Sequence, residues 1–164
     1  VYENPMGVLT NSPSFDYHMQ NLANYLNLTS EEPANRFSPD LDLKPYSLGM
    51  GTIGLPGDLS SASRFVRAVF TKFNSCVGET ESAAISQFFH ILGSVAQPDG
   101  CTKTASRYER TVYSSCCNTD QGIYYYTTYE NPCIHAVDLH RVDLEKEELY
   151  RYPLVRETQI KYQN

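Results

Sequence analysis

The spacing of hydrophobic residues predicts three helices in the N-terminal part of the chain. The first begins at Phe15, directly after Ser14, whose side chain can cap it, and its apolar residues recur every three or four positions. The second runs to about Asn74 after the glycine-rich stretch 48–57, and the third spans about residues 80–94. Apolar residues occupy more than one side of the second helix, which is typical of a helix packed between partners.

Beyond about residue 107 the pattern becomes that of β-strands, with many Tyr, Thr, Val and Cys residues. Strands over 108–117 and 123–129 are joined by a polar segment that contains a glycine, which predicts a hairpin. A third strand is predicted over 133–139, after an Asn-Pro turn. Helices first and an antiparallel meander afterwards predict an α+β fold.

Three other segments complete the predicted architecture. The short apolar run 6–11 is interpreted as a buried strand that ends before Pro13. Residues 29–45 contain three prolines, several acids and little apolar periodicity, so they are predicted to form a surface loop. The charged, tyrosine-bearing tail over 145–164 is expected to lie over an edge of the sheet.

The composition supports one globular domain and argues against several classes of partner. The 164 residues are 41% hydrophobic, which is enough to build a core. The net charge of −6 argues against nucleic acids and anionic membranes, because both bind clustered basic residues. No apolar run approaches the roughly 20 residues of a membrane-spanning helix, and the first residues do not read as a secretion signal.

The cysteines and histidines form no metal-binding or redox motif. The five cysteines are Cys76, Cys101, Cys116, Cys117 and Cys133. A zinc site would need closely spaced Cys and His ligands, which do not occur, so no metal is expected. We interpret the thiols as reduced and mostly buried, in a cytoplasmic protein. The four histidines, which no motif surrounds, are interpreted as surface or core residues.

The stretch from Gly49 to Gly54 matches the letters of a dinucleotide-binding fingerprint. That fingerprint requires an apolar strand before the glycines and a helix that opens at them. Here Lys44-Pro45 precedes the stretch, and Pro56-Gly57 lies where that helix would have to run. We therefore interpret the glycines as residues of tight turns or close backbone contacts.

Two polar residues stand out as candidates for chemistry. Asn11 lies at the end of a predicted strand and just before a proline, where a held amide could donate to an oxyanion or simply close an Asx-turn. Arg64 is flanked by small and apolar residues on the second predicted helix, and a buried arginine needs an anionic partner. That partner is either Asp58, in a structural role, or a reacting thiolate or substrate.

Several longer motifs resemble the choloylglycine hydrolase family, which comprises the bile salt hydrolases and the penicillin V acylases. The motifs are GVLTNSP at 7–13, FDYH at 15–18, GLPGDLSS at 54–61, SRFVRA at 63–68, YYYTTYEN at 124–131 and AVDL at 136–139. They cover nearly the whole chain in order. The LSSASRF version at 59–65 is more similar to the bile salt hydrolase branch.

The resemblance implies an N-terminal-nucleophile hydrolase with an αββα sandwich of antiparallel sheets. In that family an N-terminal cysteine attacks an amide bond, and its own α-amino group serves as the base. By motif, Asn11 corresponds to the family's catalytic asparagine, which helps to hold the oxyanion, and Arg64 corresponds to its catalytic arginine near the nucleophile. The resemblance also implies a conjugated bile acid as substrate, with glycine or taurine as the leaving amine, no metal or organic cofactor, and a homotetramer.

The chain departs from the family at its beginning, since it starts with Val1 and none of its cysteines occupies the nucleophile position. We therefore expect residues 1–164 to be the C-terminal half of a single choloylglycine hydrolase domain, inactive without the missing N-terminal half. Two alternatives remain open. The parent enzyme could act on penicillin V or another N-acyl amide, or the chain could be a non-catalytic interaction fragment.

Overall fold

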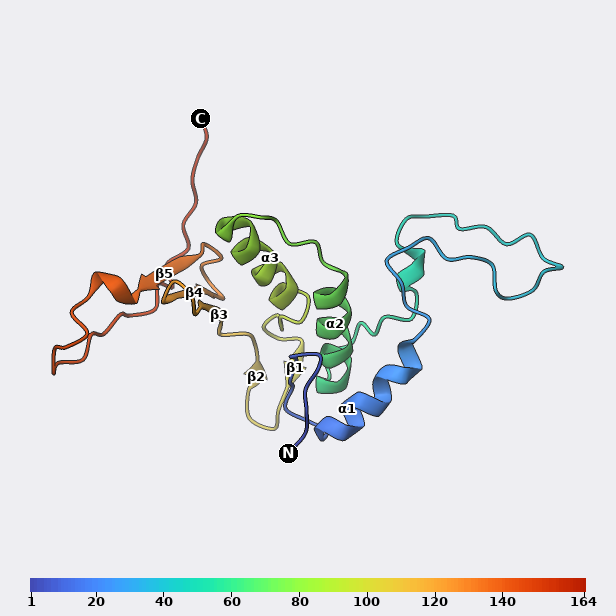
Figure 1. The fold of residues 1–164 in the computed structure, drawn as a ribbon, viewed down its shortest axis with the longest axis horizontal. Helices are drawn as coiled ribbons and strands as arrows, with labels where there is room; N and C mark the ends of the chain where they lie inside the picture. Colours follow the sequence, from blue (N-terminus) through green and yellow to red (C-terminus); the bar gives the residue numbers. More distant parts are fainter. The chain divides into compact units, whose positions relative to one another are not determined.

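The computed structural model describes residues 1–164, which divide into two compact units. The first unit spans Val1–Gly78 and the second spans Glu79–Asn164. In Figure 1 the first unit runs from blue to green along the sequence and the second from green to red. No helix in either unit is long and apolar enough to cross a membrane.

The first unit is built on two packed helices, α1 (Phe15–Leu22) and α2 (Ser61–Asn74). Both were predicted, and α2 begins where the Ser60 side chain accepts a hydrogen bond from the Ser63 amide. The buried side chains between the helices come from His18, Phe65 and Val66. The fully buried residues of α2 are Ser63, Phe65 and Val66, all in its first half, whereas Phe73 near its end is 62% exposed.

The segment 6–11 is not a strand, contrary to the prediction. A strand needs a neighbour to complete its hydrogen bonds, and no segment pairs with this one. Instead, Gly7 adopts φ of +58°, and the Asn4 side chain bonds to the Gly7 amide and the Val8 carbonyl. The Met6 side chain is buried, and Leu9 is 73% exposed. Residues 6–11, an apolar run without a pairing partner, therefore form an irregular segment that leads to Asn11.

The predicted loop over residues 29–45 is confirmed, since it contains no helix or strand. Figure 1 shows it as a long excursion beyond α1, drawn in light blue to teal. It returns through the short 3₁₀ helix η2 (Met50–Thr52), where a side chain on Gly51 would clash with the Glu31 carbonyl oxygen. Gly49 has a φ of +79°, and no strand precedes it, so the glycines serve turns and a close contact rather than a dinucleotide fingerprint.

The second unit contains α3 (Glu81–Gly93) and two antiparallel sheets. The larger sheet has the order β3-β4-β5, and α3 packs against β3. Its strands are β3 (Tyr113–Asn118), β4 (Ile123–Thr128) and β5 (His135–Asp138). The smaller sheet pairs β1 (Thr102–Lys103) with β2 (Tyr108–Glu109). The predicted α+β class, hairpin and third strand are confirmed, whereas β1 was not predicted. The strand predicted over 108–117 is divided into β2 and β3, which belong to different sheets.

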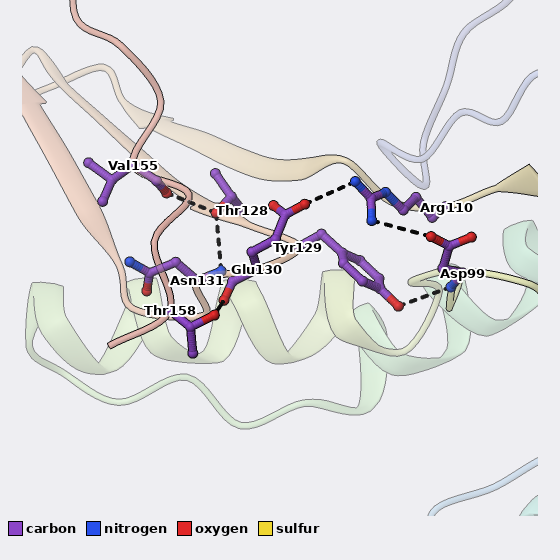
Figure 2. Close-up of polar contacts among 8 residues, drawn as sticks. All are labelled: Asp99, Arg110, Thr128, Tyr129, Glu130, Asn131, Val155 and Thr158. Atoms are coloured by element: carbon purple, nitrogen blue, oxygen red, sulfur yellow. Dashed lines mark hydrogen bonds and ion pairs between the residues drawn. The ribbon is translucent and has the colours of Figure 1, made fainter. Parts of the chain in front are cut away.

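The C-terminal tail has no helix or strand, yet it is fixed to the end of β4 by hydrogen bonds (Figure 2). The Thr128 hydroxyl donates to the Val155 carbonyl at 2.9 Å, and the Asn131 side chain donates to the Glu157 carbonyl at 2.9 Å. The Thr158 hydroxyl donates to the Glu130 carbonyl at 2.8 Å. The tail therefore lies against the end of β4 and the turn after it.

The cysteines are less buried than predicted. Cys76, Cys101 and Cys117 are exposed, whereas Cys116 and Cys133 are half-buried, and all five thiols are free. Adjacent residues of a strand point to opposite faces, so only one member of the Cys116–Cys117 pair can face α3. Burial, followed by the neighbouring Cys117, raises the pKa of Cys116.

Candidate active site

Asn11 and Arg64 meet in the first unit, although 53 residues separate them in sequence. Arg64 lies in the first turn of α2, and its Nη2 donates a hydrogen bond to Asn11 Oδ1 at 3.1 Å. Its Nε donates to the Leu59 carbonyl at 3.2 Å, which orients the guanidinium from the residues just before the helix. The structure therefore brings together the two residues that the sequence singled out. Their catalytic roles remain a prediction.

The contact with Arg64 determines which end of the Asn11 amide is available. A guanidinium has only donors, so it must face the amide oxygen. The Nδ2 group, with its two N–H donors, then points elsewhere and has no partner within the chain. Asn11 itself is exposed, so this donor is accessible to a bound molecule. A neutral amide donor held in place is suited to stabilise negative charge that develops on a carbonyl oxygen.

Asp58, the alternative partner considered for Arg64, performs a different task. Its carboxylate accepts hydrogen bonds from the Ser60 amide at 2.9 Å and from the Ser63 hydroxyl, and thereby supports the start of α2. Hydrogen bonds from Ser60 and then Ser63 lower the pKa of Asp58 from 3.8 to about 2. Because Asp58 forms no ion pair with Arg64, the structural alternative is wrong. No carboxylate neutralises the Arg64 guanidinium in this structure.

The residues around this pair come from irregular backbone as well as from helices. The Ser12 amide donates to the Ser61 hydroxyl at 3.1 Å, so the segment that carries Asn11 is attached to the N-terminus of α2. The neighbouring Arg67 donates to the carbonyls of Pro56 and Asp58, which holds the approach to the helix. The strand prediction for 6–11 therefore gave the wrong backbone for the segment that carries Asn11.

No cysteine of the first unit is placed to attack a carbonyl held by this pair. Cys76 follows the C-terminal end of α2, whereas Arg64 lies in the first turn, and the intervening helix is roughly 15 Å long. No group of three or more His, Cys, Asp or Glu residues is arranged to hold a metal ion. The site therefore offers an amide donor and a guanidinium, and the one cysteine of the first unit, Cys76, lies at the other end of α2.

The second unit has an open hollow of about 440 Å³ with a different character. Phe89, Tyr113 and Tyr129 contribute to its mostly apolar lining, which contains no acid, lysine, arginine, histidine or cysteine. Such a hollow can receive apolar groups, and no side chain in its lining changes charge near neutral pH. The Asn11–Arg64 pair is therefore the better candidate for chemistry.

Comparison with known proteins matches residues 1–152 to the model of the linear amide C–N hydrolases, choloylglycine hydrolase family. A bile salt hydrolase/transferase of Lactiplantibacillus plantarum is 57% identical over 160 residues, which are 97% of this chain and 49% of that protein. A bile salt hydrolase/transferase of Clostridium perfringens is 38% identical over 165 residues, which are 100% of this chain and 50% of that protein. The chain spans about half the length of the curated relatives it matches.

Solved structures give the same result for the fold. A mutant conjugated bile acid hydrolase from Clostridium perfringens superposes with a TM-score of 0.85 at 38% identity, over 98% of this chain and 49% of that chain. A penicillin V acylase from Agrobacterium tumefaciens superposes with a TM-score of 0.62 at 23% identity, over 85% of this chain and 38% of that chain. The predicted α+β fold of an N-terminal-nucleophile hydrolase is confirmed.

Proposed function

Because the chain belongs to the choloylglycine hydrolase family, we propose that the full-length protein hydrolyses the amide that joins a bile acid to glycine or taurine. The observation that carries this proposal is the contact between Arg64 and Asn11 at 3.1 Å, which leaves the Asn11 Nδ2 donors without a partner. Similarity to proteins named bile salt hydrolase/transferase, at up to 57% identity, supports the choice of substrate.

The nucleophile in this proposal is an N-terminal cysteine supplied from outside residues 1–164, which form the C-terminal half of a single domain. The relatives' greater length supports this arrangement, since the chain covers about half of them. An α-amino group has a pKa of about 7.7–8.0, so it can accept the thiol proton near neutral pH, which a lysine side chain could not. The cysteine's own amine therefore serves as the base.

The reaction proceeds by acyl transfer in two stages. The thiolate sulfur attacks the amide carbon, and the carbonyl electron pair moves onto oxygen, where the Asn11 Nδ2 group donates a hydrogen bond. The intermediate collapses to a thioester, and glycine or taurine leaves with the proton that the α-amine held. Water then attacks the thioester, the free bile acid departs, and the thiol is regenerated. Arg64 orients the Asn11 amide throughout and adds positive charge beside the oxyanion.

The test is an activity panel on the full-length protein with glycocholate, taurocholate and penicillin V. We expect hydrolysis of at least one bile acid conjugate, measured by release of glycine or taurine, and slower hydrolysis of penicillin V. Preferential cleavage of penicillin V would favour the second candidate, an acylase of that type, to which the fold likeness also extends. No hydrolysis of any of the three amides would contradict the proposal and favour a non-catalytic interaction role.

A further control concerns residues 1–164 alone. In our proposal this chain lacks a nucleophile, so the purified chain should not cleave any of the three amides. Adding a separate polypeptide that begins with cysteine and carries the N-terminal half should restore activity, and intact-mass analysis would show both species. Turnover by residues 1–164 alone would contradict the assignment of the nucleophile.

A further inference from the structure

His18 is a fully buried polar residue in the first unit, and its environment links it to both members of the candidate site. It lies in α1 with an exposed fraction of 0%. Its ring stacks on the ring of Phe65, with centroids 4.4 Å apart and planes 13° apart. Phe65 directly follows Arg64 in α2 and is itself 0% exposed. The stacked pair therefore fixes one side of the helical turn that carries the arginine.

The polar edge of the same ring points to the segment that carries Asn11. His18 Nε2 lies 3.1 Å from the hydroxyl of Thr10, the residue directly before Asn11. The other ring nitrogen, Nδ1, is buried and has no partner. Burying a polar ring without hydrogen bonds costs free energy. The bond to Thr10 is the only side-chain hydrogen bond that offsets this cost for His18.

The backbone of Asn11 is thus tied on both sides. Thr10 is attached to α1 through His18, and Ser12 is attached to α2 through the Ser61 hydroxyl. Between these two attachments, the Asn11 side chain has a single hydrogen bond, to Arg64. Because no strand supports this segment, side-chain bonds must supply the rigidity that a sheet would otherwise give.

We propose that His18 and Thr10 are positioning residues for the amide reaction, which hold the Asn11 amide against Arg64 without touching the substrate. This inference rests on the proposed function for its activity readout. An oxyanion donor acts only when it is already aimed at the site of developing charge, and a displacement of about 1 Å can cost about a hundredfold in rate. Removing the Thr10–His18 bond should therefore lower turnover more than substrate binding.

The first test compares two changes at Thr10 in the full-length protein. Thr10→Val keeps the shape of the side chain but removes the hydroxyl, so kcat should fall about two- to tenfold, the value of one hydrogen bond, with KM changed less than about twofold. Thr10→Ser keeps the hydroxyl and should recover most of that loss. Thr52→Val is the matched control, because the Thr52 hydroxyl likewise forms one hydrogen bond within the first unit, to the Gly49 carbonyl, and Thr52 is not part of the site.

The second test uses the two amide side chains that imitate different ring nitrogens. His18→Gln can place a polar atom near the Nε2 position and keep a bond to Thr10, whereas His18→Asn reaches only as far as Nδ1. Turnover per folded molecule should be higher for His18→Gln than for His18→Asn. Equal turnover in the two variants would contradict a positioning role through Thr10.

A structural readout separates this inference from the proposed function. In a crystal structure of the Thr10→Val variant, the Asn11 Oδ1 to Arg64 Nη2 distance should lengthen beyond 3.1 Å. An unchanged distance, or a Thr10→Val kcat equal to that of Thr52→Val, would overturn the positioning role. If the unmodified enzyme cleaves none of the amides, the proposed function fails, and the distance in the variant still decides this inference.

Discussion

The two units of the chain use the same residue types in opposite ways. In the second unit, Asn131 is fully buried, its Oδ1 accepts from the Cys133 amide, and its Nδ2 donates to the Glu157 carbonyl. In the first unit, Asn11 is exposed, and only its Oδ1 is engaged. The Asn131 amide is buried and bonded to the chain at both ends, whereas the exposed Asn11 amide keeps both of its N–H donors free.

The arginines show the same difference. Arg110 in the second unit forms ion pairs with Asp99 and Glu130, and its guanidinium lies over the ring of Tyr129 (Figure 2). Arg64 in the first unit bonds only to a carbonyl and an amide oxygen. The network of Arg110 joins a loop to the end of β4 and leaves its charge neutralised. Residue type therefore does not identify the site here, whereas unused bonding capacity does.

The largest effect is expected from Asn11→Ala in the full-length protein. Removal of an oxyanion donor typically lowers kcat by about 10²–10³. Because Asn11 is exposed and makes one side-chain hydrogen bond, thermal stability should change little. Steady-state kinetics with glycocholate, together with a melting curve, would check both statements. Turnover near that of the unmodified enzyme would contradict the claim that the free Asn11 donors take part in the reaction.

Arg64→Lys should have the next largest effect on turnover. Lysine keeps the positive charge but cannot bond to the Leu59 carbonyl and the Asn11 oxygen in the same fork. Loss of hydrogen bonds from a charged donor predicts a fall in kcat of about 10- to 100-fold. The matched change Arg110→Lys should leave kcat unchanged while weakening its ion pairs. Equal kinetic losses at both arginines would contradict the distinction drawn between them.

The sequence predicted the regular elements better than the contacts of the site. Helices α1, α2 and α3 and the hairpin of β3 and β4 were found because their local patterns agree with their tertiary surroundings. The predicted cap of α1 was wrong in detail, since the Ser14 side chain forms no capping hydrogen bond. The irregular segment before Asn11 was taken for a strand, because an apolar run does not reveal whether a pairing partner exists. The first helix is also shorter than its apolar repeat allows, because α1 ends at Leu22, and Leu26 one turn later is 85% exposed.

The pairing of Asn11 with Arg64 could be anticipated from motif resemblance, but not from spacing. A hydrogen bond between residues 53 positions apart depends on how α1 and α2 pack, which no local pattern encodes. The contact between Thr10 and His18 was not predicted, because a lone histidine in a helix does not indicate which residue its ring will bond to. The separation of Arg64 from Asp58 likewise emerged only in the folded chain, since the spacing alone allowed an ion pair.

Asn131→Ala tests the claim that Asn131, unlike Asn11, serves to stabilise the fold. The change removes a fully buried side chain and leaves the part-buried Cys133 amide and Glu157 carbonyl without their partner, so unfolding should become easier by about 2–3 kcal/mol. Urea unfolding of the full-length protein measures this value. Asn74→Ala, which removes one bond to the Phe70 carbonyl at the exposed end of α2, is the control and should cost well under half as much. A negligible loss for Asn131→Ala would show that the tail is not fixed through this residue.

The smallest effect is expected from Asp58→Asn, which should change how the free energy of unfolding depends on pH under acidic conditions. Its pKa is lowered in the folded state from 3.8 to about 2, so its stabilising effect is present above 3.8 and is lost as the pH falls toward 2. The carboxylate is exposed, so the contribution is modest. Asp58→Asn should lower stability slightly at pH 7 and flatten its decline between pH 4 and pH 2 in urea titrations. Because Asp58 does not pair with Arg64, the same variant should keep most of its kcat. A loss of turnover as large as that of Arg64→Lys would show that the carboxylate controls the guanidinium after all.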